Sequence, residues 1–183
     1  MELLYSAALI IAAYWLGACP FAVWIGSKIL HRDIRNYGDH NPGAANVFRA
    51  GSVKWGFITV SLEVAKGVPF VLLSCILFKL PDPLVYSVAI SAVLGHAFSP
   101  FLNLNGGKAT AVTFGVLVTI PNREILIIFI ILMTLGFFIL SGDSWRIVLS
   151  MAGTLLYTVI MDKGLWPILF TLCLLAIITF KNM

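Results

Sequence analysis

The sequence predicts an all-α fold, a polytopic membrane helix bundle of about seven transmembrane helices. Apolar residues make up 60% of the 183-residue chain and charged residues 11%, and the mean hydropathy is +1.00, far above ordinary soluble domains. Long apolar runs alternate with short polar clusters. The residue-by-residue alternation typical of barrel strands is absent. With no internal repeat and no long linker, we expect one domain over residues 1–183.

The first three apolar segments are the longest, and each predicts a spanning helix because a crossing needs about 20 apolar residues. They are Leu3 to Leu30, Trp55 to Leu80 and Leu84 to Leu104. Gly17 and Pro20 predict a kink in the first helix, which is tolerated when neighbouring helices satisfy the freed backbone groups. Leu16 to Cys19 also resembles a lipoprotein processing site, so cleavage there is the alternative interpretation.

Four shorter apolar segments complete the predicted bundle. They are Ala109 to Ile120, Ile125 to Leu140, Ile147 to Ile160 and Leu165 to Phe180. The first three of these are short for a straight crossing. We expect them to be joined differently or to lie beside a locally thinned bilayer.

The basic residues predict the orientation of the bundle, because Lys and Arg near helix ends favour the cytoplasmic side. One set of loops and ends holds eight of them, namely Lys28, Arg32, Arg35, Arg49, Lys54, Lys108, Arg146 and Lys181. The opposite set holds three, namely Lys79, Arg123 and Lys163. We therefore expect the amino terminus outside the cell and the carboxyl terminus in the cytoplasm.

Residues 38–49 read GDHNPGAANVFR and form a polar loop on the predicted cytoplasmic side. Gly38, Gly43 and the Asn41-Pro42 turn allow backbone amides to approach a ligand closely, and a helical turn can begin at Ala44. Amides at such a turn, followed by the Arg49 guanidinium group, suit a phosphate.

A second polar loop on the same side reads NLNGGK and ends at Lys108. Gly106 and Gly107 free the backbone, the following helix offers its amino-terminal dipole, and Lys108 supplies a cation. Each loop has a second interpretation, since membrane proteins need tight loops and basic residues for topology alone. Two such loops on one face favour ligand binding.

Three ionisable residues lie inside apolar segments, where burial is costly and usually functional. Glu63 and Lys66 stand three positions apart on one helix, as a structural pair or as support for a site. His96 is either a hydrogen-bonded structural residue or part of a site. Asp143 and Arg146 are expected on a solvated surface. The three cysteines lie apart, without the spacing of a metal site.

Both polar loops and two helix segments match motifs of one known family. A first-loop motif that reads like GSGNxGATNVxR is matched by Gly38, Asn41, Gly43, Ala44, Asn46, Val47 and Arg49. A later motif that reads like GHxFSxFLxFxGGKG is matched by Gly95, His96, Phe98, Ser99, Phe101, Leu102, Gly106, Gly107 and Lys108. The Lys66-Gly67 pair after Glu63, and Gly17 to Ile25, are also similar. The chain thus resembles the acyl-phosphate-dependent glycerol-3-phosphate acyltransferases, the PlsY family.

The resemblance implies a seven-helix fold in a bacterial inner membrane, with cytoplasmic active-site loops. It also implies that an acyl group passes from acyl phosphate to the 1-hydroxyl of sn-glycerol 3-phosphate, which gives lysophosphatidic acid and phosphate in phospholipid synthesis. Both substrates carry phosphate, which suits the loops, and the bundle would hold the acyl tail among membrane lipid. Positioning and charge stabilisation suffice for this activated donor, so we expect no cofactor, metal or nucleic acid.

The chain departs from the family pattern in both loops and at its end. Asp39 replaces a serine, and a carboxylate there repels phosphate unless it is protonated, paired or turned away. His40, where glycine is usual, is the partner we consider for it. Ala45 replaces a threonine, which removes a hydroxyl donor, and Ala109 replaces a glycine, which narrows the allowed backbone conformations. The family's basic carboxyl-terminal segment with its histidine is missing.

The resemblance then assigns roles to individual residues. Catalysis is expected from Arg49, Lys108 and His96. Arg49 and Lys108 bind phosphate groups, and His96 and Lys66 orient them. Substrate binding is expected from Asp39, Asn41, Gly43, Ala44, Asn46, Lys66, Ser99, Gly106 and Gly107, and from Ser144 and Asn182 as the counterparts of carboxyl-terminal family motifs.

Two hypotheses from other functional classes stand beside this one. The first is a protein that keeps the fold and the anion loops but binds or transports an organic phosphate without acyl transfer, as Asp39 and the short tail suggest. The second is a structural partner in a lipid-synthesis complex, which predicts that neither loop binds phosphate compounds.

Overall fold

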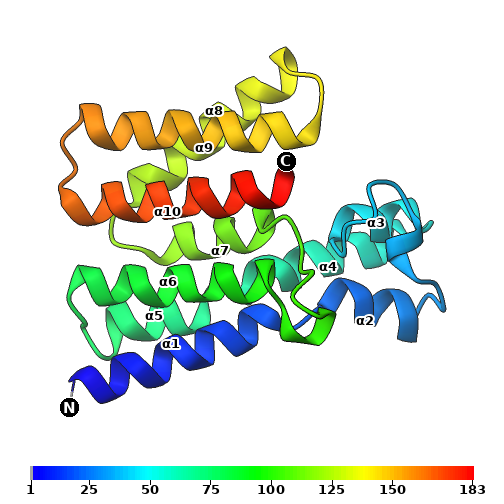
Figure 1. Cartoon of the computed structure of the whole chain (residues 1–183), viewed down its shortest axis with the longest axis horizontal. Coiled ribbons are helices and arrows are strands. Elements are labelled where there is room, and N and C mark those ends of the chain that lie inside the picture. Colours follow the sequence, from blue (N-terminus) through cyan, green and yellow to red (C-terminus); the bar gives the residue numbers. More distant parts are fainter. Residues whose placement is uncertain (1) are drawn as a thin grey trace.

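The structure, a computed structural model, describes residues 2–183, and every regular element in this range is helical (Figure 1). The first half of the chain forms α1 (Glu2–Ala18), α2 (Phe21–Lys28), η1 (Ile34–Asn36), α3 (Ala44–Arg49), α4 (Val53–Ala65) and α5 (Pro69–Ile76). The second half forms α6 (Asp82–Ala97), η2 (Pro100–Leu102), α7 (Thr110–Thr119), α8 (Arg123–Ile139), α9 (Asp143–Ile160) and α10 (Leu165–Asn182). The all-helical prediction is confirmed, since each predicted apolar segment contains at least one helix.

Proline residues determine where several of these helices end. Pro20 is the N-cap of α2, so the first predicted helix is broken between α1 and α2, where the kink was expected. A second break, between α4 and α5, was not expected; Pro69 begins α5 there, and it lacks the amide hydrogen that a continuous helix needs. The third helix was expected to reach Leu104 but ends at Ala97, because Pro100 starts a separate 3-10 turn.

Four stretches are long and apolar enough to cross a membrane: Leu3–Lys28, Val53–Ile76, Asp82–Leu102 and Leu165–Asn182. With ten residues, α7 is only about 15 Å long at 1.5 Å per residue, about half of the hydrocarbon thickness. The outer surface exposes large apolar side chains such as Phe138, at 79%, and Ile139, at 76%. Such a surface suits lipid rather than water.

The contact between α1 and α6 relies on small residues and on hydrogen bonds across the helices. A Cβ at Gly17 or Gly95 would overlap the backbone of the other helix, so both positions require glycine. The Ser91 hydroxyl donates to the Ile10 carbonyl at 2.7 Å, and the Tyr14 hydroxyl donates to the Phe98 carbonyl at 3.0 Å. These contacts fix the position of the carboxyl-terminal end of α6.

A second close contact joins α4 and α7. A Cβ at Gly115 on α7 would overlap the Val64 carbonyl on α4, and one at Gly67 would lie 2.7 Å from the Val112 carbonyl. Figure 1 shows α9 and α10 side by side, and α10 also packs against α6. The end of α10 meets the loop before α7, where Asn182 Nδ2 donates to the Lys108 carbonyl at 3.3 Å. This end of the bundle carries the candidate site.

Candidate active site

The loop before α3 is held by its own side chains. Gly38 has a φ of +55°, and a Cβ there would come within 2.6 Å of Asn46 and Arg49, so glycine lets both side chains fold back. Asn46 is only 1% exposed. Its Nδ2 donates to the Asn41 carbonyl at 2.8 Å, and its Oδ1 accepts from Arg49 Nη1 at 2.8 Å. The buried Asn46 amide therefore positions the Arg49 guanidinium.

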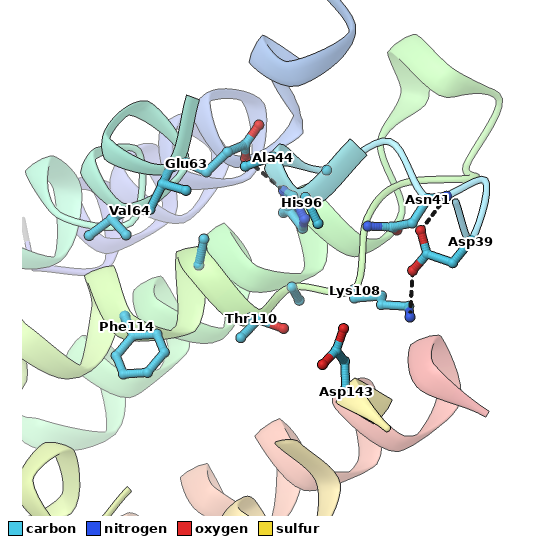
Figure 2. Close-up of a pocket in the computed structure, with 15 residues that line it drawn as sticks. Asp39, Asn41, Ala44, Glu63, Val64, His96, Lys108, Thr110, Phe114 and Asp143 are labelled. Carbon is cyan, nitrogen blue, oxygen red and sulfur yellow. Dashed lines mark hydrogen bonds and ion pairs between the residues drawn. The ribbon is translucent and has the colours of Figure 1, made fainter. Parts of the chain in front are cut away.

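The Asp39 carboxylate connects this loop to the second one. Its Oδ2 lies 2.8 Å from Lys108 Nζ and its Oδ1 lies 3.5 Å from Arg49 Nη1; Figure 2 shows the carboxylate directed at Lys108. Partial burial alone would raise the pKa of Asp39. The hydrogen bond and charge of Lys108, helped by the Asn41 amide and the Asn46 side chain, outweigh burial and lower this pKa below its usual value.

His40 does not pair with Asp39, so that part of the sequence interpretation is wrong. The His40 backbone is left-handed, with a φ of +60°. Its Nδ1 lies 2.8 Å from the Arg35 carbonyl oxygen instead. A carboxylate at position 39 was expected to be protonated, paired or turned away. It is paired, and its partners are cations.

The second loop packs tightly on His96. A Cβ at Gly106 would overlap the His96 carbonyl and one at Gly107 would overlap the imidazole, while the Gly107 amide donates to the His96 carbonyl at 3.2 Å. Ala109, the N-cap of α7, has a φ of +63°. This is the left-handed region that favours glycine. Ala109 therefore replaces the family's glycine at a position where the backbone conformation favours glycine.

Two residues from the last two helices, α9 and α10, contact Lys108. Lys108 Nζ donates to Ser144 Oγ at 3.4 Å, and Asn182 Nδ2 donates to the Lys108 carbonyl at 3.3 Å. The two weakest motif matches in the sequence therefore both contact the second loop.

A buried polar cluster lies beneath the loops. Glu63 Oε2 lies 2.6 Å from Lys66 Nζ and 3.1 Å from His96 Nδ1, and Glu63 and Lys66 are 2% and 3% exposed. Lys66 Nζ also donates to the Cys19 carbonyl at 3.0 Å, at the break between α1 and α2. Glu63 and Lys66 thus form an ion pair and support His96 at the same time.

A cavity of about 340 Å³ opens beside this cluster. Its polar end is lined by Asp39, Asn41, Gly43, Ala44, His96 and Lys108 (Figure 2). Its apolar part lies between α4 and α7 and is lined by Val60, Val64, Ala111 and Phe114. A second cavity, of about 280 Å³, shares Lys108, Thr110 and Asp143 with the first. The two cavities therefore adjoin at these three residues.

Several predicted site residues lie away from the larger cavity. The Ser99 hydroxyl is buried and donates to the Ala18 carbonyl at 2.6 Å, and Lys66 and Gly107 line only a recess of about 10 Å³ behind His96. Asp143 was expected on a solvated surface, and its side chain is 71% exposed, but it lines both cavities. Its position in a short polar cluster between two apolar segments carried no signal of this.

The fold and the site together define an integral membrane protein of helices, with a pair of cations beside an apolar cavity. The model of the family described as glycerol-3-phosphate acyltransferase matches residues 7–183. The chain belongs to the glycerol-3-phosphate acyltransferase family, as its motifs predicted.

Individual relatives agree with this membership. The glycerol-3-phosphate acyltransferase of Macrococcus caseolyticus is 34% identical over 181 residues, which cover 94% of this chain and 87% of that protein. The protein of the same name from Leptospira borgpetersenii is 43% identical over 126 residues, which cover 67% of this chain but only 57% of the Leptospira protein. The crystal structure of PlsY, an integral membrane glycerol 3-phosphate acyltransferase in its glycerol 3-phosphate form, superposes with a TM-score of 0.85 at 25% identity, covering 97% of this chain and 88% of that one.

Proposed function

We propose that this protein transfers an acyl group from acyl phosphate to the 1-hydroxyl of sn-glycerol 3-phosphate, releasing lysophosphatidic acid and phosphate. The observation that carries the proposal is the larger cavity, which combines a polar part that includes Lys108 with an apolar part between α4 and α7. Both substrates carry a phosphate and one carries an acyl chain, so one cavity with a polar and an apolar part can bind both. Membership of a family with this name supports the same reaction.

The reaction needs no covalent intermediate on the protein. The hydroxyl oxygen of glycerol 3-phosphate forms the new bond to the acyl carbon, the bond from that carbon to the phosphate oxygen breaks, and the hydroxyl proton leaves on the released phosphate. Negative charge develops on the carbonyl oxygen and on the leaving phosphate. We assign the stabilisation of this charge to Lys108, which lines the cavity, and to Arg49, which contacts the same Asp39 carboxylate. Fixed cations in a partly dehydrated site stabilise such charge efficiently.

The acyl chain lies in the apolar part of the larger cavity, between α4 and α7. Val60 and Val64 form one wall, and Ala111 and Phe114 form the other. Burial of apolar chain surface is worth about 25 cal/mol per Å², so this wall holds the donor while its phosphate remains near Lys108. His96, held by Glu63 and packed against Gly107, positions the loop that carries Lys108.

The molecule acts as one domain of seven crossings in the bacterial inner membrane, with its amino terminus outside. The basis is the eight-to-three distribution of Lys and Arg between the two sets of loops. The two site loops belong to the more basic set. Glycerol 3-phosphate then reaches the site from the cytoplasm.

Release of lysophosphatidic acid by the purified protein in detergent tests the reaction. Glycerol 3-phosphate is supplied with palmitoyl phosphate, palmitoyl-CoA or an acyl carrier protein thioester in parallel, and product is expected from palmitoyl phosphate alone. Arg49→Ala and Lys108→Ala should each lower the rate by about 10² to 10³ if each stabilises transition-state charge. Arg35→Ala is the control, because Arg35 pairs with Asp33 at the surface, 50% exposed.

Wild-type rates in both cation variants would rule out this assignment of the site. Binding of glycerol 3-phosphate without product from any donor would instead support the hypothesis of a phosphate-binding or transport protein.

A further inference from the structure

The Asp39 carboxylate occupies the space between the two cations that the proposed function assigns to phosphate. One oxygen lies 2.8 Å from Lys108 Nζ and the other lies 3.5 Å from Arg49 Nη1. The carboxylate is held there by two further donors, the Asn46 amide at 3.0 Å and the Asn41 backbone amide at 3.3 Å. An oxyanion of the chain itself therefore satisfies the donors that a phosphate would use.

The other carboxylates around the larger cavity have different partners. Asp143 Oδ1 pairs with Arg146 Nη1 at 2.7 Å, and Glu63 pairs with Lys66 and His96 below the loops. Among the ion pairs of residues 2–183, those of Asp39 are the ones that involve Arg49 and Lys108. The side chains of Asp39 and Arg49 are 38% and 43% exposed, so an incoming anion can reach the pair.

We propose that Asp39 is an internal competitor for phosphate, which sets the affinity of the site for glycerol 3-phosphate and for released phosphate. The inference takes the identity of the substrate from the proposed function. Its test does not depend on that function. An anion binds only after the carboxylate leaves Lys108 and Arg49. The same competition helps the product phosphate to dissociate, because the carboxylate returns as the phosphate leaves.

The size of the effect follows from the fraction of molecules in which Asp39 is bound to Lys108 and Arg49. The apparent affinity is the intrinsic affinity multiplied by the fraction of molecules in which the site is free. If Asp39 holds the cations in about 90% of molecules, removal of its charge tightens phosphate binding by about tenfold. The factor is the same for every ligand that binds through phosphate alone.

The test is calorimetric titration of the purified protein in detergent with inorganic phosphate and, separately, with glycerol 3-phosphate. Asp39→Asn keeps the shape of the side chain without its charge, and Asp39→Ser shortens it. Asp143→Asn is the matched control, because it removes one negative charge from the wall of the same cavity without freeing either cation. Size-exclusion elution and helical circular dichroism report the fold of each variant.

We expect both Asp39 variants to bind both ligands about tenfold more tightly, and Asp143→Asn to differ from wild type by less than about threefold. Equal or weaker binding in folded Asp39 variants would overturn the proposal, because a residue that orients the cations or contacts substrate loses affinity when it is removed. Equal tightening in Asp143→Asn would also overturn it, since a general change in charge would then explain the result.

The kinetic constants separate this inference from the proposed function. If lysophosphatidic acid forms, the KM for glycerol 3-phosphate and the inhibition constant of inorganic phosphate should both fall about tenfold in Asp39→Asn. Tighter phosphate binding with no product in any variant would leave the competitor role intact and reject the reaction. Product formation with unchanged phosphate affinity would support the reaction and reject the competitor role.

Discussion

Glu63 is a carboxylate buried inside a helix bundle, and its environment explains why it is tolerated there. Lys66 lies 2.6 Å from Oε2 and His96 lies 3.1 Å from the same oxygen, while the Ala22 amide donates to Oε1 at 3.4 Å. A buried charge is stable only with such partners. Through His96 the carboxylate also supports the loop that carries Lys108.

Glu63→Gln should therefore destabilise the protein by about 3–5 kcal/mol, because it leaves the Lys66 ammonium buried without its partner. A thermal melt in detergent measures the loss as a lower Tm. Asp33→Asn is the control, since the Asp33–Arg35 pair is exposed at the surface and such pairs contribute about 0–1 kcal/mol. Equal Tm values for the two variants would contradict the structural importance of the Glu63 cluster.

The sequence predicted the types of residue in this site better than their contacts. Arg49, Lys108 and His96 stood out as polar residues at the ends of apolar segments, and all three are found at one end of the bundle. The partner of Asp39 was not predictable, because Lys108 is distant in the sequence and meets it only through the packing of α4, α6 and α7. The nearest candidate, His40, points instead to the Arg35 carbonyl.

At the scale of helices, glycine residues set the distance between α4 and α7. A Cβ at Gly115 would overlap the Val64 carbonyl, and the same two helices form the apolar walls of the larger cavity. The shape of that cavity therefore depends on a backbone contact. Hydropathy located both apolar segments but not the break at Pro69, because the residues on both sides are equally apolar.

Gly115→Ala should push α4 and α7 apart and destabilise the protein by about 1–3 kcal/mol, the usual cost of overpacking. For a chain of this size, each kcal/mol lowers Tm by about 2–4 °C. Gly136→Ala on α8 is the matched control, because its Cβ would lie 3.6 Å from the nearest atom, an ordinary van der Waals contact. A Gly115→Ala protein that melts no lower than Gly136→Ala would show that the contact is not tight.

At the scale of the whole molecule, the loops of the site and the carboxyl terminus lie at one end of the bundle. Asn36 in η1 and Met161 after α9 are both exposed, and the connection between α9 and α10 lies at the end of the bundle away from α3 (Figure 1). The sequence predicted that these loops share one side from the order of the apolar segments. That this side faces the cytoplasm stays a prediction from the basic residues at helix ends. The predicted count of about seven crossings is not confirmed, because four stretches are long and apolar enough to span a membrane and α7, with ten residues, is short for a crossing.

The proposed orientation predicts the labelling of single cysteines introduced after the native ones are replaced. Asn36→Cys should react with a membrane-impermeant maleimide in inside-out vesicles, and Met161→Cys should react in right-side-out vesicles. The reverse pattern would invert the orientation. Labelling of both from the same side would contradict an odd number of crossings between them.

The meeting of both cavities at Lys108 also has a meaning for inhibitor design. Each cavity alone, at about 340 and 280 Å³, is close to the lower limit of common small-molecule sites. A single compound with a central anion at Lys108 and one arm in each cavity would occupy both cavities at once. It would gain the contacts of both cavities while losing its rotational and translational freedom only once.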